Sequence, residues 1–221
     1  MTEIPHLSNL PEGDWADRME QSVLDSALQL APRLGWNTRL VREACAAQGL
    51  SEGDQELLLP NGARDLAALS WRRHDAQALA ALGNPAPLKI RARIAIAVAT
   101  RLEVAAAHAE AEKRLAGFMA LPTNTDLVLS LTWATADGLW RWAGDTATDW
   151  NHYSKRTILS GILIPAMTLR LFNGKQASDA FVAARIENVM AFEKWKAGKD
   201  FDAPIRRVTD VLSRLRYPTR A

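Results

Sequence analysis

The densest group of chemically capable side chains lies at residues 139–156, which read LWRWAGDTATDWNHYSKR. This stretch combines three tryptophans, a tyrosine, a histidine, two aspartates and three basic residues, although aromatic residues make up only 7% of the chain. Such side chains could build a catalytic site, a metal site, a nucleic-acid surface, or a surface that contacts a lipid or a protein. The spacing of the candidates decides among these alternatives.

Histidines are the first candidates for metal or acid–base chemistry. They are scattered along the chain, at His6, His74, His108 and His152. His108 with Glu112 and Asp149 with His152 have helical spacing, so either pair could supply half of a metal site. No second half accompanies them, whereas a di-iron bundle needs repeated Glu-x-x-His elements. GxSxG, GxGxxG and phosphate-loop motifs are also missing. We therefore predict no metal, no cofactor and no catalytic residue.

Composition limits the remaining classes. The chain has 221 residues, of which 48% are apolar, so it can bury a sizeable core. Its formal net charge of +2 gives no reason to expect a nucleic-acid partner. Leu- and Ala-rich segments repeat apolar residues at spacings of three and four, which predicts an all-α fold. The single cysteine, Cys45, excludes a disulfide within the chain and is expected to be buried.

The amino-terminal part predicts a tail followed by a small helical lobe. Residues 1–16 form a flexible tail without a signal-peptide or transit-peptide pattern, which favours a cytoplasmic location. Residues 17–84 form the lobe, with helices over 17–34, from about 38 to 48, and from 51 onward. Gly49 and the capping residue Ser51 separate the last two helices. This is the outline of a helix-turn-helix, and the order is similar to the amino-terminal third of TetR-type regulators.

The third predicted helix is acidic, which opposes DNA binding. It carries Glu52, Asp54 and Glu56 and no basic residue. A helix that enters the major groove needs Lys, Arg or backbone amides near the phosphates. We therefore interpret the helix-turn-helix as degenerate and predict no nucleic-acid partner. A TetR-type ligand-responsive repressor remains the alternative function.

Residues 85–198 predict a larger helical lobe. Helices are expected over 88–115, 125–142, about 149–172 with Pro165 inside, and 178–198. The short connection after residue 142 makes two of these helices antiparallel neighbours. Their apolar side chains form either a plain core or the wall of a lipid pocket, and Gly138, Gly161 and Pro165 favour the pocket. The residues predicted to bind lipid are Trp133, Leu139, Trp140, Ile162, Leu163 and Met167.

The carboxy-terminal segment, residues 199–221, predicts a linker and an amphipathic helix. Apolar residues occupy one stripe, and arginines occupy the other side. This pattern is typical of a helix that lies in a membrane interface, although docking on the parent fold or on a dimer partner is an equal alternative. No apolar run is long enough to span a bilayer. The predicted membrane-binding residues are Ile205, Arg206, Arg207, Val208, Val211, Leu212 and Leu215.

Several segments together resemble a known family. They are KIRARIAIAVATRLE, HAEAEKRLAGFMALP, WATADGLWRWAGDTATDWNHYSKR and ARIENVMAFEKWK, and the AGD-x-x-TD-x-N-x-Y-x-KR stretch is the most specific. The chain resembles the lipid-binding accessory protein of ubiquinone biosynthesis over roughly residues 17–198. That family has a TetR-like fold without a DNA-binding function.

The resemblance implies a function and a setting. It implies a non-enzymatic homodimer that binds isoprenoid quinone precursors in an apolar pocket and presents them to the demethoxyubiquinone hydroxylase. The carboxy-terminal amphipathic helix would act at an anionic membrane, here the inner membrane of a bacterium. The resemblance places Asp149, Tyr153 and Arg156 in the patch that faces the partner. His152 lies in the same patch, where mitochondrial relatives tend to carry tryptophan.

Overall fold

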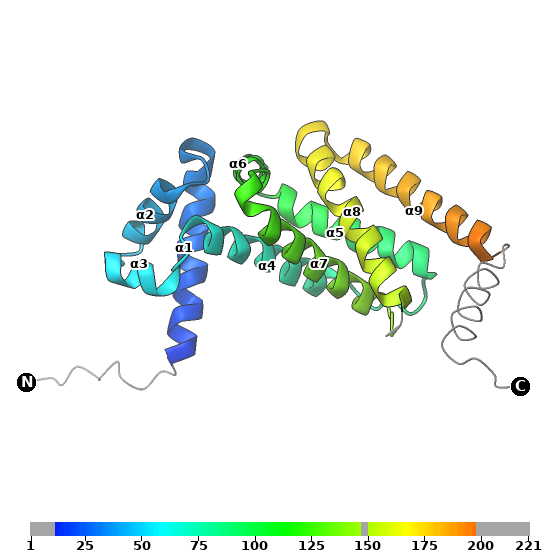
Figure 1. Cartoon of the computed structure of the whole chain (residues 1–221). Helices are drawn as coiled ribbons and strands as arrows, with labels where there is room; N and C mark the ends of the chain where they lie inside the picture. The colour runs from blue at the N-terminus through cyan, green and yellow to red at the C-terminus, as the bar shows by residue number, and fades with distance from the viewer. Residues whose placement is uncertain (1–11, 147–149, 198–221) are drawn as a thin grey trace, which may run out of the picture. The chain divides into compact units, whose positions relative to one another are not determined.

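The computed structural model describes residues 12–146 and 150–197 (Figure 1). Helices and their connections make up these ranges, and they contain no strand, so the all-α prediction is confirmed. The chain divides into two compact units, Met1–Val182 and Ala183–Ala221. The TetR-like detail and the predicted domain boundaries stay predictions.

The elements follow one another with short connections. The described helices are α1 (Glu12–Leu34), α2 (Thr38–Ala47), α3 (Glu52–Leu58), α4 (Ala63–Ala81), α5 (Ile90–Ala106), α6 (Ala109–Met119), the 3-10 helix η1 (Pro122–Asn124), α7 (Thr125–Trp142), α8 (Trp150–Asn173) and α9 (Lys175–Ala197).

Local capping explains why α2 and α3 begin where they do. The Asn37 side chain accepts a hydrogen bond from the backbone N–H of Leu40, which caps α2. At α3, the Ser51 side chain accepts from the N–H of Asp54, and the Asp54 carboxylate accepts from the N–H of Ser51. Gly49, at φ +70°, makes the turn between the two helices. One of the three acids of α3 therefore serves as a cap, and the helix keeps its acidic character.

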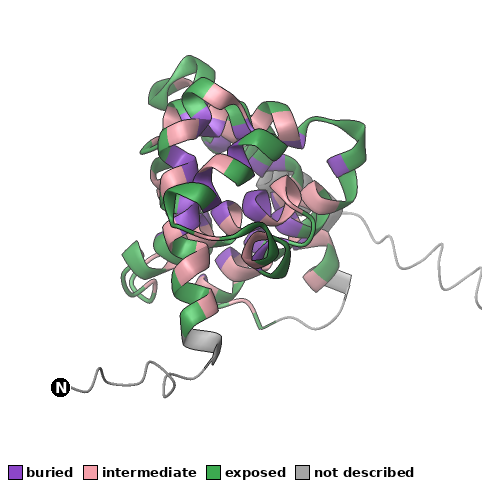
Figure 2. Cartoon of the chain, turned by 90° about the vertical axis from the view of Figure 1, so that its left-hand side faces the viewer, coloured by how far each residue is buried: buried purple, intermediate pink, exposed green. Residues whose placement is uncertain are grey.

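Buried apolar side chains hold the amino-terminal helices together. Leu24 and Ala27 of α1 pack in one core with Leu40 of α2, Leu66 of α4 and Leu115 of α6. Figure 2 shows such buried positions on the inner faces of the helices and exposed positions on their outer turns. Burying a leucine side chain contributes about 1.5–3 kcal/mol, so these contacts dominate the stability of this region. Cys45 is buried in the same core, as expected.

The structure corrects the predicted continuous helix over 88–115. The chain breaks at Ala107 and His108, which separate α5 from α6. No glycine or proline marks this break. Instead α6 packs mainly on α1 and α5 packs mainly on α4, while both contact α8, so tertiary packing overrides the helix-forming composition. His108 is exposed at the start of α6 while Glu112 is buried, so these two residues at helical spacing do not face one site.

Pro165 lies inside α8 without ending it. Proline removes one backbone N–H and disturbs the preceding turn, but its position on α8 is exposed. Gly161 is also exposed, and a Cβ added there would meet no atom within 4 Å. Its missing side chain therefore faces open space and does not enlarge a cavity. Within the described ranges, no helix combines the length and apolar character needed to cross a membrane.

Candidate functional site

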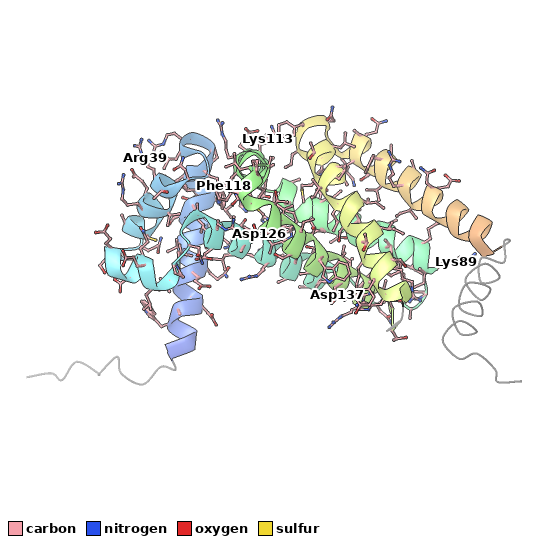
Figure 3. All side chains as sticks on the ribbon, viewed as in Figure 1. Arg39, Lys89, Lys113, Phe118, Asp126 and Asp137 are labelled. Atoms are coloured by element: carbon pink, nitrogen blue, oxygen red, sulfur yellow. The ribbon has the colours of Figure 1, made fainter. Side chains whose placement is uncertain are left out.

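Arg156 ties α7 to the start of α8. Its Nε donates to Asp137 Oδ1 at 2.6 Å, and its Nη1 donates to Asp145 Oδ2 at 3.0 Å and to the His152 carbonyl at 3.0 Å. Asp137 lies toward the carboxyl end of α7 (Figure 3). Only 1% of Arg156 is exposed. A buried guanidinium between two carboxylates fixes the angle and register at which the two helices meet.

Asp145 connects the same pair of helices through a second cation. Its Oδ1 accepts a hydrogen bond from Lys155 Nζ at 2.6 Å. The Lys155 ammonium also lies 5.3 Å from the ring centroid of Trp140, whose Nε1 donates to the Lys155 carbonyl at 3.1 Å. Burial acts to raise the pKa of Asp145, but the hydrogen bonds from Lys155 and Arg156 outweigh it, so this pKa lies below its ordinary value.

The AGD tripeptide of the sequence builds the carboxyl end of α7. Gly144 has φ +90°, which L side chains rarely adopt. The Nη1 of Arg93 donates to the Ala143 carbonyl at 2.7 Å, and its Nε donates to the Leu88 carbonyl at 2.8 Å. A Cβ on Gly144 would lie 3.1 Å from that Nη1, so a larger residue would be strained by its conformation and would also push the end of the Arg93 side chain aside. Arg93 thus caps α7 and anchors the chain before α5.

An aromatic patch, defined here as Trp133, His152 and Tyr153, lies outside this buried network. Tyr153 is 56% exposed. Its ring centroid lies 6.2 Å from that of Trp133 and 5.1 Å from that of His152, which it meets edge-on. Aromatic pairs at these separations hold each other in place. The patch therefore presents an ordered aromatic surface to solvent.

Arg156, which the resemblance placed in the partner-facing patch, is 1% exposed and is enclosed by Asp137 and Asp145. Its role in a partner contact stays a prediction. Arg156 Nη1 donates to the carbonyl of His152, a member of the aromatic patch, and Tyr153 is exposed. Asp149 lies outside the described residues. So do the predicted membrane-binding residues Ile205, Arg206, Arg207, Val208, Val211, Leu212 and Leu215.

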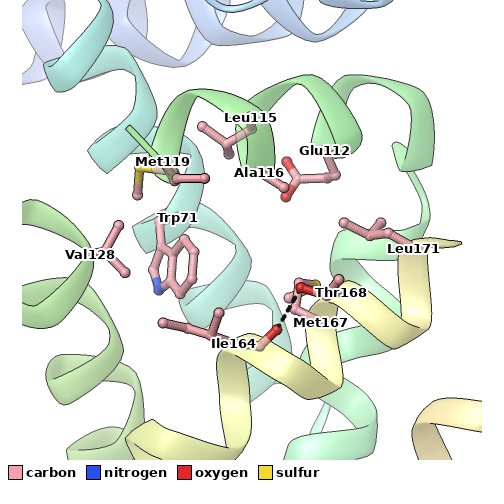
Figure 4. A pocket seen from close by; sticks show the side chains of 11 residues that line it. Trp71, Glu112, Leu115, Ala116, Met119, Val128, Ile164, Met167, Thr168 and Leu171 are labelled. Carbon is pink, nitrogen blue, oxygen red and sulfur yellow. Dashed lines mark hydrogen bonds between the residues drawn. The ribbon is translucent and has the colours of Figure 1, made fainter. Parts of the chain in front are cut away.

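An apolar pocket of about 240 Å³ lies among α4, α6, α7 and α8 (Figure 4). Most of its lining side chains are hydrocarbon or aromatic, and Glu112 and Thr168 are the exceptions. Such a cavity suits the hydrophobic portion of a small ligand. Its lining residues are Trp71, Glu112, Leu115, Ala116, Met119, Ala120, Val128, Ile164, Met167, Thr168 and Leu171.

Of the six residues predicted to bind lipid, Met167 lines this pocket. Leu139, Ile162 and Leu163 are buried between packed helices. Trp133 and Trp140 are half-buried, and they belong to the aromatic patch and to the Lys155 contact described above. The prediction that these side chains bind lipid stays a prediction, although the cavity and most of these six residues lie at different places.

Trp71, Glu112 and Met119 were not predicted to line a pocket, because they come from α4 and α6 rather than from the α7–α8 pair. A signal was present in the sequence. Glu112, Leu115 and Met119 recur at three-, four- and seven-residue helical spacings, which puts a carboxylate on an apolar helix face. Acidic residues are rarely buried on an apolar helix face unless they have a partner, so Glu112 at this position could have been noticed.

Glu112 is buried next to a neutral histidine. It is 4% exposed, and its Oε1 lies 3.8 Å from Nδ1 of His74, which is 1% exposed. Burial raises the pKa of Glu112 to about 7, against the opposing effects of Arg101 and the nearby Ser70 hydroxyl. Burial also lowers the pKa of His74 to about 3, assisted by the positive charges of Arg101, His108 and Arg73. At neutral pH His74 is therefore uncharged, and the two groups do not form an ion pair.

Arg101 carries the positive charge beneath the pocket. Its Nε donates to Asp75 Oδ1 at 2.5 Å, and it lies 5.2 Å from the Trp71 ring centroid. Trp71 Nε1 donates to Thr135 Oγ1 at 2.8 Å, and the same hydroxyl donates to Asp75 Oδ2 at 2.7 Å. This network fixes the indole that forms one wall of the cavity. Burial raises the pKa of Asp75, although Arg101 and Thr135 act against it.

The described ranges contain no group of three or more His, Cys, Asp or Glu residues placed to hold a metal ion. The described part of the chain is thus helical, and it carries an apolar pocket and an ordered aromatic patch that both include residues of α7 and α8. Residues 125–193 match the COQ9 family model. This matched segment contains the α7–α8 corner and the α8 wall of the pocket.

Named proteins match the chain over a longer stretch than the family model does. The chain is 30% identical over 154 residues to the ubiquinone biosynthesis protein COQ9, mitochondrial, of Rattus norvegicus, covering 66% of this chain and 49% of the relative. The proteins of the same name from Xenopus tropicalis and Homo sapiens are 29% identical over 154 residues. The chain spans about half the length of the curated relatives it matches. The predicted resemblance is confirmed, and the chain is COQ9-like.

Proposed function

We propose that this chain is a non-enzymatic accessory protein of ubiquinone biosynthesis that binds an isoprenoid lipid in its apolar pocket. The names of the relatives supply the pathway. The observation that carries the proposal is the overlap between the pocket and the segment matched by the family model. Five lining residues fall within residues 125–193, namely Val128, Ile164, Met167, Thr168 and Leu171.

Filling the pocket is expected to remove the bound lipid. Ala116→Phe would place a ring in the cavity, whereas Ala134→Phe would add the same ring at an exposed position of α7. Excluding even two methylene groups of lipid forfeits about 1.6 kcal/mol, so we expect at least a roughly tenfold loss of bound lipid. Mass spectrometry of organic extracts of the purified proteins measures it.

Three results would separate the possibilities. Isoprenoid lipid in the wild-type and Ala134→Phe extracts but not in the Ala116→Phe extract supports the proposal. Equal amounts of lipid in all three would show that the lipid lies elsewhere. Absence of isoprenoid lipid from wild-type protein, together with no uptake from isoprenoid-loaded vesicles, would contradict lipid binding itself.

The aromatic patch is the proposed contact for the demethoxyubiquinone hydroxylase. Exposed aromatic side chains often dominate the energy of an interface. Because the patch and the pocket share helices α7 and α8, a bound lipid would lie near the partner. The linker and amphipathic membrane helix predicted at 199–221 and the homodimer belong to the same proposal, in which the protein acts peripherally at the inner membrane.

Tyr153→Ala is expected to weaken hydroxylase binding by about thirtyfold, the effect of losing roughly 2 kcal/mol at an interface hot spot. Lipid content and melting temperature should stay near wild type, since Tyr153 does not line the pocket. Phe172→Ala is the matched control, because Phe172 lies on the same helix and is similarly exposed. Co-purification and titration with the hydroxylase measure the effect, and equal weakening by both variants would contradict a contact specific to the patch.

A repressor function has weaker support. The described α3 carries Glu52 and Glu56 with exposed side chains, and the Asp54 carboxylate caps the helix. Three carboxylates would face a phosphate backbone if this helix entered the major groove. A DNA-binding role therefore conflicts with the charge of the element that would read the bases.

A further inference from the structure

Glu112 is an unexpected group in the wall of an apolar pocket. Its carboxylate lies among hydrocarbon side chains and is almost fully buried. Figure 4 shows the side chain extending from α6 among the lining residues, near Ala116. Among the residues that the structure describes, Oε1 of Glu112 has no hydrogen-bond partner. A buried acceptor of this kind is rare, and it destabilises the protein unless something donates to it.

The neighbours of Glu112 leave this acceptor unmatched. His74 Nδ1 is 3.8 Å from Oε1, which is beyond hydrogen-bond range, and it too has no partner in the described part of the chain. Arg101 donates from Nε to Asp75, and its Nη1 has no partner among the described residues. Ser70 lies close enough to lower the pKa of Glu112, although its hydroxyl too has no partner that meets hydrogen-bond geometry. Neither residue lines the cavity, and the Thr168 hydroxyl, which does, donates to the Ile164 carbonyl at 3.0 Å. The unpartnered buried acceptor in the lining is therefore that of Glu112.

The chemistry of this acceptor selects among ligands. A pure hydrocarbon would cover Glu112 and leave Oε1 without a partner, while an anionic head group would be repelled whenever the carboxylate is charged. A hydroxyl can donate one hydrogen bond to the carboxyl group of Glu112 and carries no charge of its own. Sites with a buried polar group discriminate strongly in favour of ligands that supply its partner.

We propose that Glu112 is the recognition group of the pocket and accepts a hydrogen bond from a hydroxyl group on an otherwise apolar ligand. The inference rests on the proposed lipid-binding function and adds a chemical requirement to it. The hydroxyl lies at Glu112 on α6, and the hydrocarbon portion lies against the apolar side chains of Trp71, Met119 and Ile164. A pocket with this requirement prefers ligands that carry a hydroxyl group, whereas a purely apolar pocket accepts any hydrocarbon chain of suitable length.

Two probes of nearly the same shape test the proposal. 4-Decylphenol carries a ring hydroxyl, and 4-decyltoluene carries a methyl group in the same place. Equilibrium dialysis gives the affinity of each for wild-type, Glu112→Leu and Glu112→Gln proteins. The measured quantity is the ratio of the two affinities in each protein, because that ratio cancels the general hydrophobicity of the probes and any uniform change in the cavity.

The phenol-to-toluene ratio is expected to fall by at least about tenfold from wild type to Glu112→Leu, since leucine cannot accept a hydrogen bond. Glutamine keeps a neutral acceptor, so Glu112→Gln should give an intermediate ratio, and it tests the proposal even if the leucine variant folds poorly. Equal ratios in all three proteins would overturn the role of Glu112 and leave lipid binding intact. Failure of both probes to bind wild-type protein would overturn the lipid-binding function and this inference together.

Discussion

Replacing Arg156 by methionine is expected to lower the free energy of unfolding by about 3–5 kcal/mol. Methionine fills much of the same space, but it leaves Asp137 without its buried partner and removes one of the two cations that hold Asp145. The side chain of Asp145 is only 5% exposed, so water cannot replace the lost hydrogen bond without local opening. The loss should appear in urea unfolding as a lower midpoint.

Arg141 supplies a control for this prediction within the same cluster. Its Nε lies 2.8 Å from Asp137 Oδ2, on the other oxygen of the carboxylate that Arg156 binds. The Arg141 side chain is 72% exposed, against 2% for Arg156. An ion pair in water contributes about 0–1 kcal/mol, so Arg141→Met should change stability little. Similar losses from the two substitutions would mean that burial does not set the strength of these pairs.

Local signals explain why most of the helices could be predicted. Asn37 and Ser51 cap helices through hydrogen bonds to residues three positions away, and Gly49 turns the chain between them. Such contacts can be inferred from a few neighbouring letters. The break at Ala107 and His108 has no such signal, because it results from the different packing partners of α5 and α6. A single sequence does not contain that information in a readable form.

The candidate sites were harder to predict than the helices, because they depend on contacts between residues that are distant in the sequence. Arg156 reads as a surface cation on a helix, and only the fold reveals that Asp137 and Asp145 enclose it. The pocket likewise combines Trp71 with Met167, which are far apart in the sequence. Tyr153 was predicted to be available to a partner, and its exposure agrees with that use, while the contact itself stays a prediction. The types of residue in the sequence thus indicated the kinds of site, but not where in the fold each residue lies.

Glu112→Gln is expected to gain about 3 kcal/mol of stability relative to wild type as pH rises from 4.5 to 7. Burial holds the pKa of Glu112 at about 7, above its ordinary value of 4.5. Between these values the unfolded chain releases the Glu112 proton and the folded protein retains it. The contribution of Glu112 to wild-type stability therefore falls as pH rises, by about 1.4 kcal/mol per pH unit, and glutamine removes that contribution. Urea unfolding across pH 4.5–7.5 measures the difference.

His74 has the opposite dependence. Its pKa falls from 6.5 to about 3 on folding, so the unfolded chain gains a proton below pH 6.5 while the folded protein does not. The contribution of His74 to wild-type stability therefore falls as pH falls through this range. Relative to wild type, His74→Gln should gain about 3 kcal/mol between pH 6.5 and 4.5.

The two dependences overlap between pH 4.5 and 6.5, where they have equal and opposite slopes. Across this window the stability of Glu112→Gln relative to wild type should therefore rise with pH, and that of His74→Gln should fall with pH. The double variant Glu112→Gln/His74→Gln should run parallel to wild type, because both contributions have been removed together. A double variant that diverges there would show that the folded pair, whose atoms lie 3.8 Å apart, changes its number of bound protons within the window. Parallel curves would show that the folded protein holds one proton at this pair throughout the window, as a protonated Glu112 beside a neutral His74 does.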